Sequence, residues 1–245
     1  MNNKLFKKCL ALLGVAAVIL IWLSRYTDID IALADWMFDS SNKEFVWRHN
    51  WFAVIFMHES MKIALIGFGI ALVVLVIVDR YIFPQFLSSE VRRGMFVVIG
   101  ALVLVPLAIS VLKASSIHSC PWDLARYGGT APYLRLFDAL PAHAVAGHCF
   151  PAGHASSGLW LAAFAVFWLP ARPRVAAVVF AMGLIPGAIL GWVQQMRGAH
   201  FLTHTLWSMW VAGLIIAVLA RLLYCSVGGQ EIGHGRMHVT NARAD

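Results

Sequence analysis

Long apolar runs alternate with short polar segments along this chain. Six runs carry no Asp, Glu, Lys or Arg, and they cover residues 9–24, 63–78, 94–112, 155–170, 175–193 and 205–220. Each is close to the roughly 17 to 25 residues that a helix needs to cross a bilayer, where no water satisfies the backbone polar groups. The pattern predicts an all-α integral membrane protein whose residues 1–225 form one six-transmembrane-helix bundle.

The composition agrees, because a chain that is 60% hydrophobic and 13% charged exceeds what one soluble core can bury. The first run is the weakest of the six, since Lys7 and Lys8 before a short apolar stretch also fit a signal peptide. The sequence that follows it, Trp22-Leu23-Ser24-Arg25, is a poor cleavage site. We therefore expect an anchored helix.

Basic residues beside the runs predict the orientation. Eleven of the nineteen Lys and Arg residues fall on the cytoplasmic side if the N-terminus is cytoplasmic: Lys4, Lys7, Lys8, Arg80, Arg92, Arg93, Arg172, Arg174, Arg221, Arg236 and Arg243. The positive-inside rule then places both termini on the cytoplasmic side of a bacterial inner membrane. The net charge of +7 is scattered over loops on both sides, so no nucleic-acid partner is expected.

Two long segments lie outside the predicted spans on the periplasmic side. Residues 26–50 mix acids with Leu, Trp, Met and Phe. This pattern predicts a short interfacial helix between spans 1 and 2 that shields a site. Residues 113–153 concentrate Lys, Arg, His, Cys and Gly. Residues 226–245 show no apolar period and are predicted to form a flexible cytoplasmic tail.

Cys120 and Cys149 share the second external segment, whereas Cys9 and Cys225 fall at cytoplasmic helix ends. An oxidising exterior favours a Cys120–Cys149 disulfide, which would stabilise the fold by on the order of 3 kcal/mol by restricting the unfolded chain. Two free thiols or metal ligands are the alternatives.

Three polar sites adjoin the spans on the same predicted face. Lys113 ends the third run, Phe150-Pro151-Ala152-Gly153-His154 precedes the fourth, and Arg197-Gly198-Ala199-His200-Phe201-Leu202-Thr203-His204 precedes the sixth. Ionisable groups at span ends that face one polar loop are seldom accidental packing. This geometry is that of a site that handles phosphate.

These segments resemble the three motifs of the type 2 phosphatidic acid phosphatase superfamily, integral-membrane lipid phosphatases related to vanadium haloperoxidases. Residues 150–156 resemble its Pro-Ser-Gly-His motif, and residues 198–204 resemble its third motif, in which Arg, five residues, His, three residues and Asp follow one another. Lys113 with Cys120-Pro121 resembles the first motif, a Lys, six residues, then Arg-Pro. The resemblance extends from about Gly94 to Ala220.

The chain departs from the family at four motif positions: Cys120 and Gln194 replace Arg, Ala152 replaces Ser, and His204 replaces Asp. Arg197, one helical turn before His200, and Arg126, in the loop after Cys120, are interpreted as relocated phosphate clamps. The rival interpretation is a divergent member that binds lipid phosphate without cleaving it.

The resemblance implies a mechanism without metal or cofactor. His200 would attack phosphorus and form a phosphohistidine, His154 would protonate the leaving group, and water would hydrolyse the intermediate. Lys113, Arg197, Arg126 and the backbone N–H groups around Ala152 and Gly153 would hold the phosphate oxygens. His204 would orient His200 without supplying the negative charge of the family's Asp; an interfacial histidine bonded to a backbone carbonyl is the other interpretation of His204.

The implied substrates are lipid phosphates or pyrophosphates reached from the membrane lipids, among them phosphatidic acid, phosphatidylglycerophosphate, undecaprenyl pyrophosphate and lipid A phosphates. Phosphoryl transfer to another lipid uses the same intermediate and stays open. His200-x-x-x-His204 also has the spacing of a metal or haem ligand pair, although no Glu follows His200 as in His-Glu-x-x-His. A transporter or scaffold without catalysis is less favoured, because no charge lies inside the spans.

Overall fold

The computed structural model describes residues 1, 3–84 and 86–225, and the predicted tail 226–245 lies outside these residues. The regular secondary structure of the described part consists of helices and one two-stranded antiparallel hairpin of β1 (Phe38–Asp39) and β2 (Glu44–Phe45), and a long loop joins η3 to α5. The long helices are α1 (Asn3–Tyr26), α3 (Met61–Tyr81), α4 (Ser89–Ala114), α6 (Pro173–Met196) and α7 (Leu202–Cys225). The shorter ones are α2 (Ile29–Met37), the π-helix η1 (Phe52–Ser60), the 3₁₀ turns η2 (Pro121–Asp123) and η3 (Ala125–Tyr127), α5 (Gly153–Leu159) and the 3₁₀-helix η4 (Trp160–Trp168).

Five helical segments are long and apolar enough to cross a membrane, and they match five of the six predicted runs: Asn3–Tyr26, Phe52–Tyr81, Ser89–Ala114, Pro173–Met196 and Leu202–Leu223. The run at 155–170 differs from the expectation of one α-helix. It forms α5, which continues directly into η4. The fourth run is therefore a composite helix of 7 α-helical and 9 3₁₀ residues.

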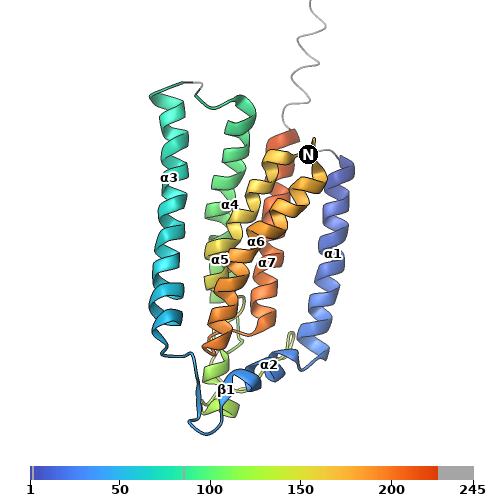
Figure 1. Ribbon diagram of the computed structural model, residues 1–245. Coiled ribbons are helices and arrows are strands. Elements are labelled where there is room, and N and C mark those ends of the chain that lie inside the picture. The colour runs from blue at the N-terminus through green and yellow to red at the C-terminus, as the bar shows by residue number, and fades with distance from the viewer. Residues whose placement is uncertain (2, 85, 226–245) are drawn as a thin grey trace, which may run out of the picture.

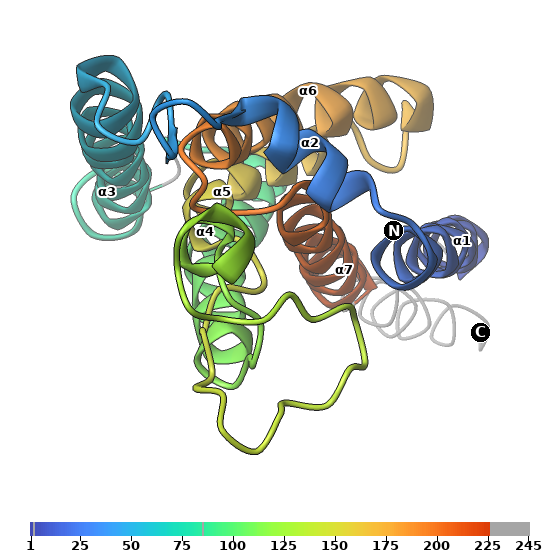
Figure 2. The ribbon, with the colours of Figure 1, turned by 90° about the horizontal axis from the view of Figure 1, so that it is seen from below.

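The long helices stand side by side, and the segments that carry the candidate chemistry gather at one end of them (Figure 1). That end holds α2, the β1 hairpin and the loop between α6 and α7, whereas the N-terminus and the turn between α3 and α4 lie at the other end. Seen along the bundle, α2 lies across the ends of α6 and α7 (Figure 2). The three predicted motif segments thus share one end of the molecule.

Helix α6 packs closely on the composite helix because glycines recur along one of its faces. Gly183, Gly187 and Gly191 are each four residues apart, which places them on one side of the helix; the first two face the composite helix, and Gly191 faces Thr205 of α7. A Cβ atom at Gly183 would lie 2.5 Å from the Cα of Ala162, and one at Gly187 would lie 2.8 Å from the carbonyl oxygen of Ala155. This small-residue packing, common between membrane helices, fixes the start of α5 beside the C-terminal end of α6.

Asp30 of α2 caps the first turn of α7 from far away in the sequence. Its carboxylate accepts hydrogen bonds from the backbone N–H of Thr203 at 3.0 Å and from the Thr203 hydroxyl at 2.5 Å. Helix α7 has no acidic residue in its own first turn, so this buried carboxyl satisfies an N–H that the helix leaves open. The contact holds α2 over the α6–α7 loop.

This cap predicts a pH-dependent stability. Burial raises the pKa of Asp30 to about 6, although the Thr203 hydrogen bonds oppose the shift. The folded state therefore binds more protons than the unfolded state between about pH 4 and 6, and stability falls as pH rises through that window. Between pH 4 and 7, we expect the free energy of unfolding of the native protein to fall by up to about 3 kcal/mol relative to that of Asp30→Asn. Unfolding of both proteins measured across this range tests it, and parallel curves would contradict it.

Candidate active site

Three helix ends bring the motif segments together. Lys113 lies in the last turn of α4, Gly153 and His154 begin α5, and His200 lies in the loop between α6 and α7. A Cβ atom added to Gly153 would lie 3.9 Å from Nζ of Lys113. The lysine ammonium group therefore lies over the first residue of α5, at a position where glycine leaves the backbone accessible.

His200 is buried within electrostatic range of the other two segments. Burial lowers the pKa of its imidazole well below the ordinary value. The neighbouring His204, Lys113 and His154 lower it further. His200 is consequently neutral near pH 7, which leaves one ring nitrogen with a free electron pair for nucleophilic attack.

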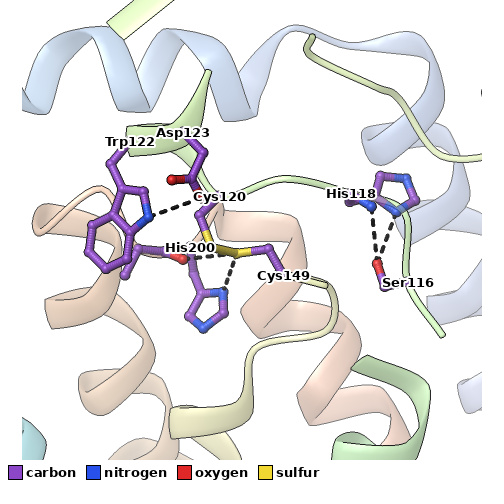
Figure 3. The surroundings of a disulfide bond; sticks show 8 residues. Ser116, His118, Cys120, Trp122, Asp123, Cys149 and His200 are labelled. Carbon is purple, nitrogen blue, oxygen red and sulfur yellow. Dashed lines mark hydrogen bonds between the residues drawn. A yellow bond between two sulfur atoms is a disulfide. The ribbon is translucent and has the colours of Figure 1, made fainter. Parts of the chain in front are cut away.

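The orientation of His200 comes from Cys149. Nδ1 of the His200 ring lies 3.4 Å from Cys149 Sγ (Figure 3). Cys149 is bonded to Cys120, as the sequence predicts, with Cα atoms 5.3 Å apart. The disulfide thus ties the loop after α4 to the segment that holds the nucleophile candidate.

His204 lies next to His200 without bonding to it. The two ring centroids are 5.8 Å apart, and within the described residues Nδ1 of His204 has no hydrogen-bond partner. The rings of Phe150 and Phe201 pack edge-on against the His204 ring. Among the described residues the polar contact of the His200 ring is with Cys149 Sγ, and an orienting role of His204 stays a prediction.

The backbone at the start of α5 is only partly free. The N–H of Ala152 donates to the His204 carbonyl at 3.1 Å, and the Ala152 carbonyl accepts from Ser208 at 2.9 Å. Ala152 therefore joins α5 to α7 and does not offer the N–H that sequence reasoning assigned to phosphate. The N–H groups of Gly153 and His154 stand at the N-terminal end of α5.

His58 and Lys62 also belong to this cluster, although neither falls within the three motifs. The His58 ring lies 3.8 Å, centroid to centroid, from the His154 ring, and the charge of Lys62 reaches both. His58 lies on the π-helix η1, a form of helix that often marks functional sites. The i, i+4 spacing of His58 and Lys62 at the start of a span was the signal that could have identified them.

The two arginines interpreted as phosphate clamps lie in different places. Arg197 is partly buried, and its charge reaches His58 and His154. Its Nη1 donates to the side-chain oxygen of Gln194 at 3.0 Å, and its Nε donates to the Arg48 carbonyl at 3.4 Å. Gln194, at the position where the family has Arg, therefore holds the arginine from the next helical turn.

Arg126 lies on the outer side of the loop. Its Nε and Nη2 atoms donate to the two carboxylate oxygens of Asp35 in α2, at 2.8 and 2.6 Å. This pairing lowers the pKa of Asp35 and raises that of Arg126. The structure gives Arg126 a carboxylate partner on α2, whereas Arg197 reaches the histidines.

The arrangement suits in-line transfer of a phosphoryl group from a substrate to neutral His200, with a second imidazole, His154, as proton donor and the cations Lys62, Lys113 and Arg197 nearby. One group of side chains in the described part of the chain has the geometry of metal ligands: Cys149, His200 and His204. The sulfur of Cys149 is already in a disulfide, so it has no thiolate to offer a metal.

A model of the PAP2 superfamily matches residues 94–226. This stretch contains Lys113, His154, His200 and the disulfide, and it leaves out His58 and Lys62. No curated protein and no solved structure matches the chain.

Proposed function

Because the chain belongs to the PAP2 superfamily, whose members are phosphatases, we propose that it hydrolyses a lipid phosphate or pyrophosphate monoester at the periplasmic face of a bacterial inner membrane. The observation that carries the proposal is that buried His200 lies at the same end of the bundle as His154, at the start of α5, and Lys113, whose Nζ would lie 3.9 Å from a Cβ atom on Gly153. That set supplies a nucleophile, a proton donor and a phosphate-binding cation at one end of a bundle of membrane-length helices.

We propose that the composite helix of α5 and η4 is the sixth membrane span, which places the candidate site at the membrane surface opposite the two termini. An α-helix rises about 1.5 Å per residue and a 3₁₀-helix about 2.0 Å, so α5 and η4 together extend about 28 Å. This approaches the roughly 30 Å hydrocarbon thickness, although the segment has only 16 residues. Six spans then keep both termini on the cytoplasmic side and α2 at the opposite surface.

In the proposed mechanism His200 attacks phosphorus in line with the leaving oxygen. Neutral His200 has one ring nitrogen with a free electron pair for this attack, and His154 donates a proton to the departing lipid oxygen. Lys113 and Arg197 stabilise the charge that spreads over the equatorial phosphate oxygens. Water then attacks the phosphohistidine and gives its proton to His154, which releases phosphate and restores both neutral His200 and protonated His154; no step requires a metal ion.

The test is phosphate release by purified protein from a panel of lipid phosphates and pyrophosphates in the presence of a chelator. We expect release from at least one of them, unchanged by the chelator. Release that the chelator abolishes would contradict the metal-independent mechanism. Appearance of the phosphate on an acceptor lipid, with no free phosphate, would reveal a phosphotransferase with the same site.

Comparing the two arginines identifies the phosphate clamp. Arg197→Gln removes a partly buried charge beside His154, and we expect kcat/KM to fall about 100-fold, the scale of losing one preorganised donor in a transition state. Arg126→Gln breaks an exposed ion pair with Asp35 and should change kcat/KM less than about fivefold. Steady-state kinetics of both variants checks this, and equal losses would place Arg126 at the phosphate as well.

A further inference from the structure

Cys149, His200 and His204 form a compact, buried group of three metal-ligand side chains. Their ligand atoms all lie within 4.8 Å of one another, and the closest pair described, Cys149 Sγ and His200 Nδ1, is 3.4 Å apart. All three residues are at most 4% exposed, and Nδ1 of His204 has no partner among the described residues. Cys120 is covalently attached to this group through Cys149.

The disulfide decides whether this group can bind a metal. In the oxidised protein both sulfur atoms are bonded to each other, and neither is a thiolate (Figure 3). Breaking that bond leaves two cysteine thiols and two imidazoles, the Cys₂His₂ set in which Zn²⁺ is tetrahedral. Zinc–ligand distances of about 2.0 to 2.3 Å put neighbouring ligand atoms about 3.3 to 3.8 Å apart, close to the observed spacing.

The geometry points to a thiol-dependent zinc site at Cys120, Cys149, His200 and His204, which forms when the disulfide is reduced and switches off hydrolysis by engaging His200. The inhibitory part rests on the proposed function, whereas zinc binding itself does not. Zinc at this site has no role in the metal-free reaction, because it occupies His200 and so competes with catalysis.

The chemistry balances with a dithiol as reductant. One dithiol gives two electrons to the Cys120–Cys149 bond, becomes a disulfide itself, and transfers its two protons to the cysteine sulfurs. Zinc binding then displaces both thiol protons, because thiolates are the ligands. Two thiolates cancel the two charges of the ion, so the complex adds no net charge beside Lys113.

Zinc bound per chain is the direct measurement. The full-length protein with Cys9→Ser and Cys225→Ser, which removes the remaining thiols, is compared before and after treatment with a dithiol that is then removed without oxygen. We expect one Zn²⁺ per chain in the reduced protein and none in the oxidised protein. No zinc in the reduced protein, or equal zinc in both states, overturns the site.

Two matched variants identify the sulfur. Both Cys120→Ser and Cys149→Ser abolish the disulfide, but only Cys120→Ser keeps a thiol 3.4 Å from His200. Cys120→Ser should bind zinc without a reductant, and Cys149→Ser should bind it more than about tenfold more weakly or not at all. Equal affinities overturn the assignment of Cys149. The reduced protein without these substitutions gives the same test if either variant fails to fold.

Phosphate release separates this inference from the proposed function. We expect zinc to stop release by the reduced protein only, with recovery when a chelator removes the metal. Stoichiometric zinc binding with full activity overturns the switch and leaves the phosphatase proposal intact. A protein that binds zinc on reduction but hydrolyses no lipid phosphate in its oxidised form keeps the metal site and contradicts the phosphatase.

Discussion

Alanine in place of His200 is expected to lower phosphate release from the lipid substrate by about 10⁴-fold or more. The reason is that a nucleophile has no substitute in a mechanism with a covalent intermediate, so what remains comes from binding and charge stabilisation alone. Lys113 and Arg197 stay in place in this variant, and substrate binding should persist. The loss should thus appear in kcat, with KM changed far less.

The intermediate gives a second measurement of the same prediction. Native protein quenched during turnover of lipid labelled in its phosphate should carry phosphorus that is labile to acid and stable to base, as expected of a phosphohistidine. His200→Ala should carry none. His143→Ala, which removes an exposed imidazole from the same external loop, is the matched control and should retain both label and activity. Label on His200→Ala protein would show that another residue is the nucleophile.

The long helices could be predicted from the sequence because the signal is local. An apolar run of membrane length has one stable backbone solution in a bilayer, so five predicted spans coincide with α1, α3, α4, α6 and α7. The run at 155–170 has the same composition but ends in a 3₁₀-helix, and no feature of its apolar pattern distinguishes the two helix types. The Cys120–Cys149 bond was predictable because only these two cysteines share the external segment.

The candidate site was only partly predictable, since its contacts join segments far apart in the chain. The His58–His154 contact joins η1 to α5, and the Asp30–Thr203 cap joins α2 to α7. Motif spacing indicated that Lys113, His154 and His200 would share one end of the bundle, because each lies beside the end of a predicted span. The contact of His200 with Cys149 Sγ was not predicted, because the motif comparison considered only His204 as a neighbour that orients His200.

The second large effect concerns His154 and depends on the leaving group. His154→Ala should lower the rate of lipid phosphate cleavage by about 10² to 10⁴-fold, the usual contribution of a positioned proton donor. An aryl phosphate that releases an acidic phenol needs little help from a proton. With that substrate, the rate of the first step in His154→Ala should therefore fall less than about tenfold, because phenolate departs without general acid catalysis.

Rapid mixing separates these steps. Native protein and His154→Ala should both release a fast burst of phenolate as His200 becomes phosphorylated, whereas only native protein should show a burst with the lipid. Lys113 and Arg197 also act on His154 through their charges, so a role in holding the phosphate is the competing explanation. Phosphate binding is needed for every substrate, and its loss would slow both bursts equally. An equal loss would therefore reassign His154 to binding, and a loss confined to the lipid would establish it as the proton donor.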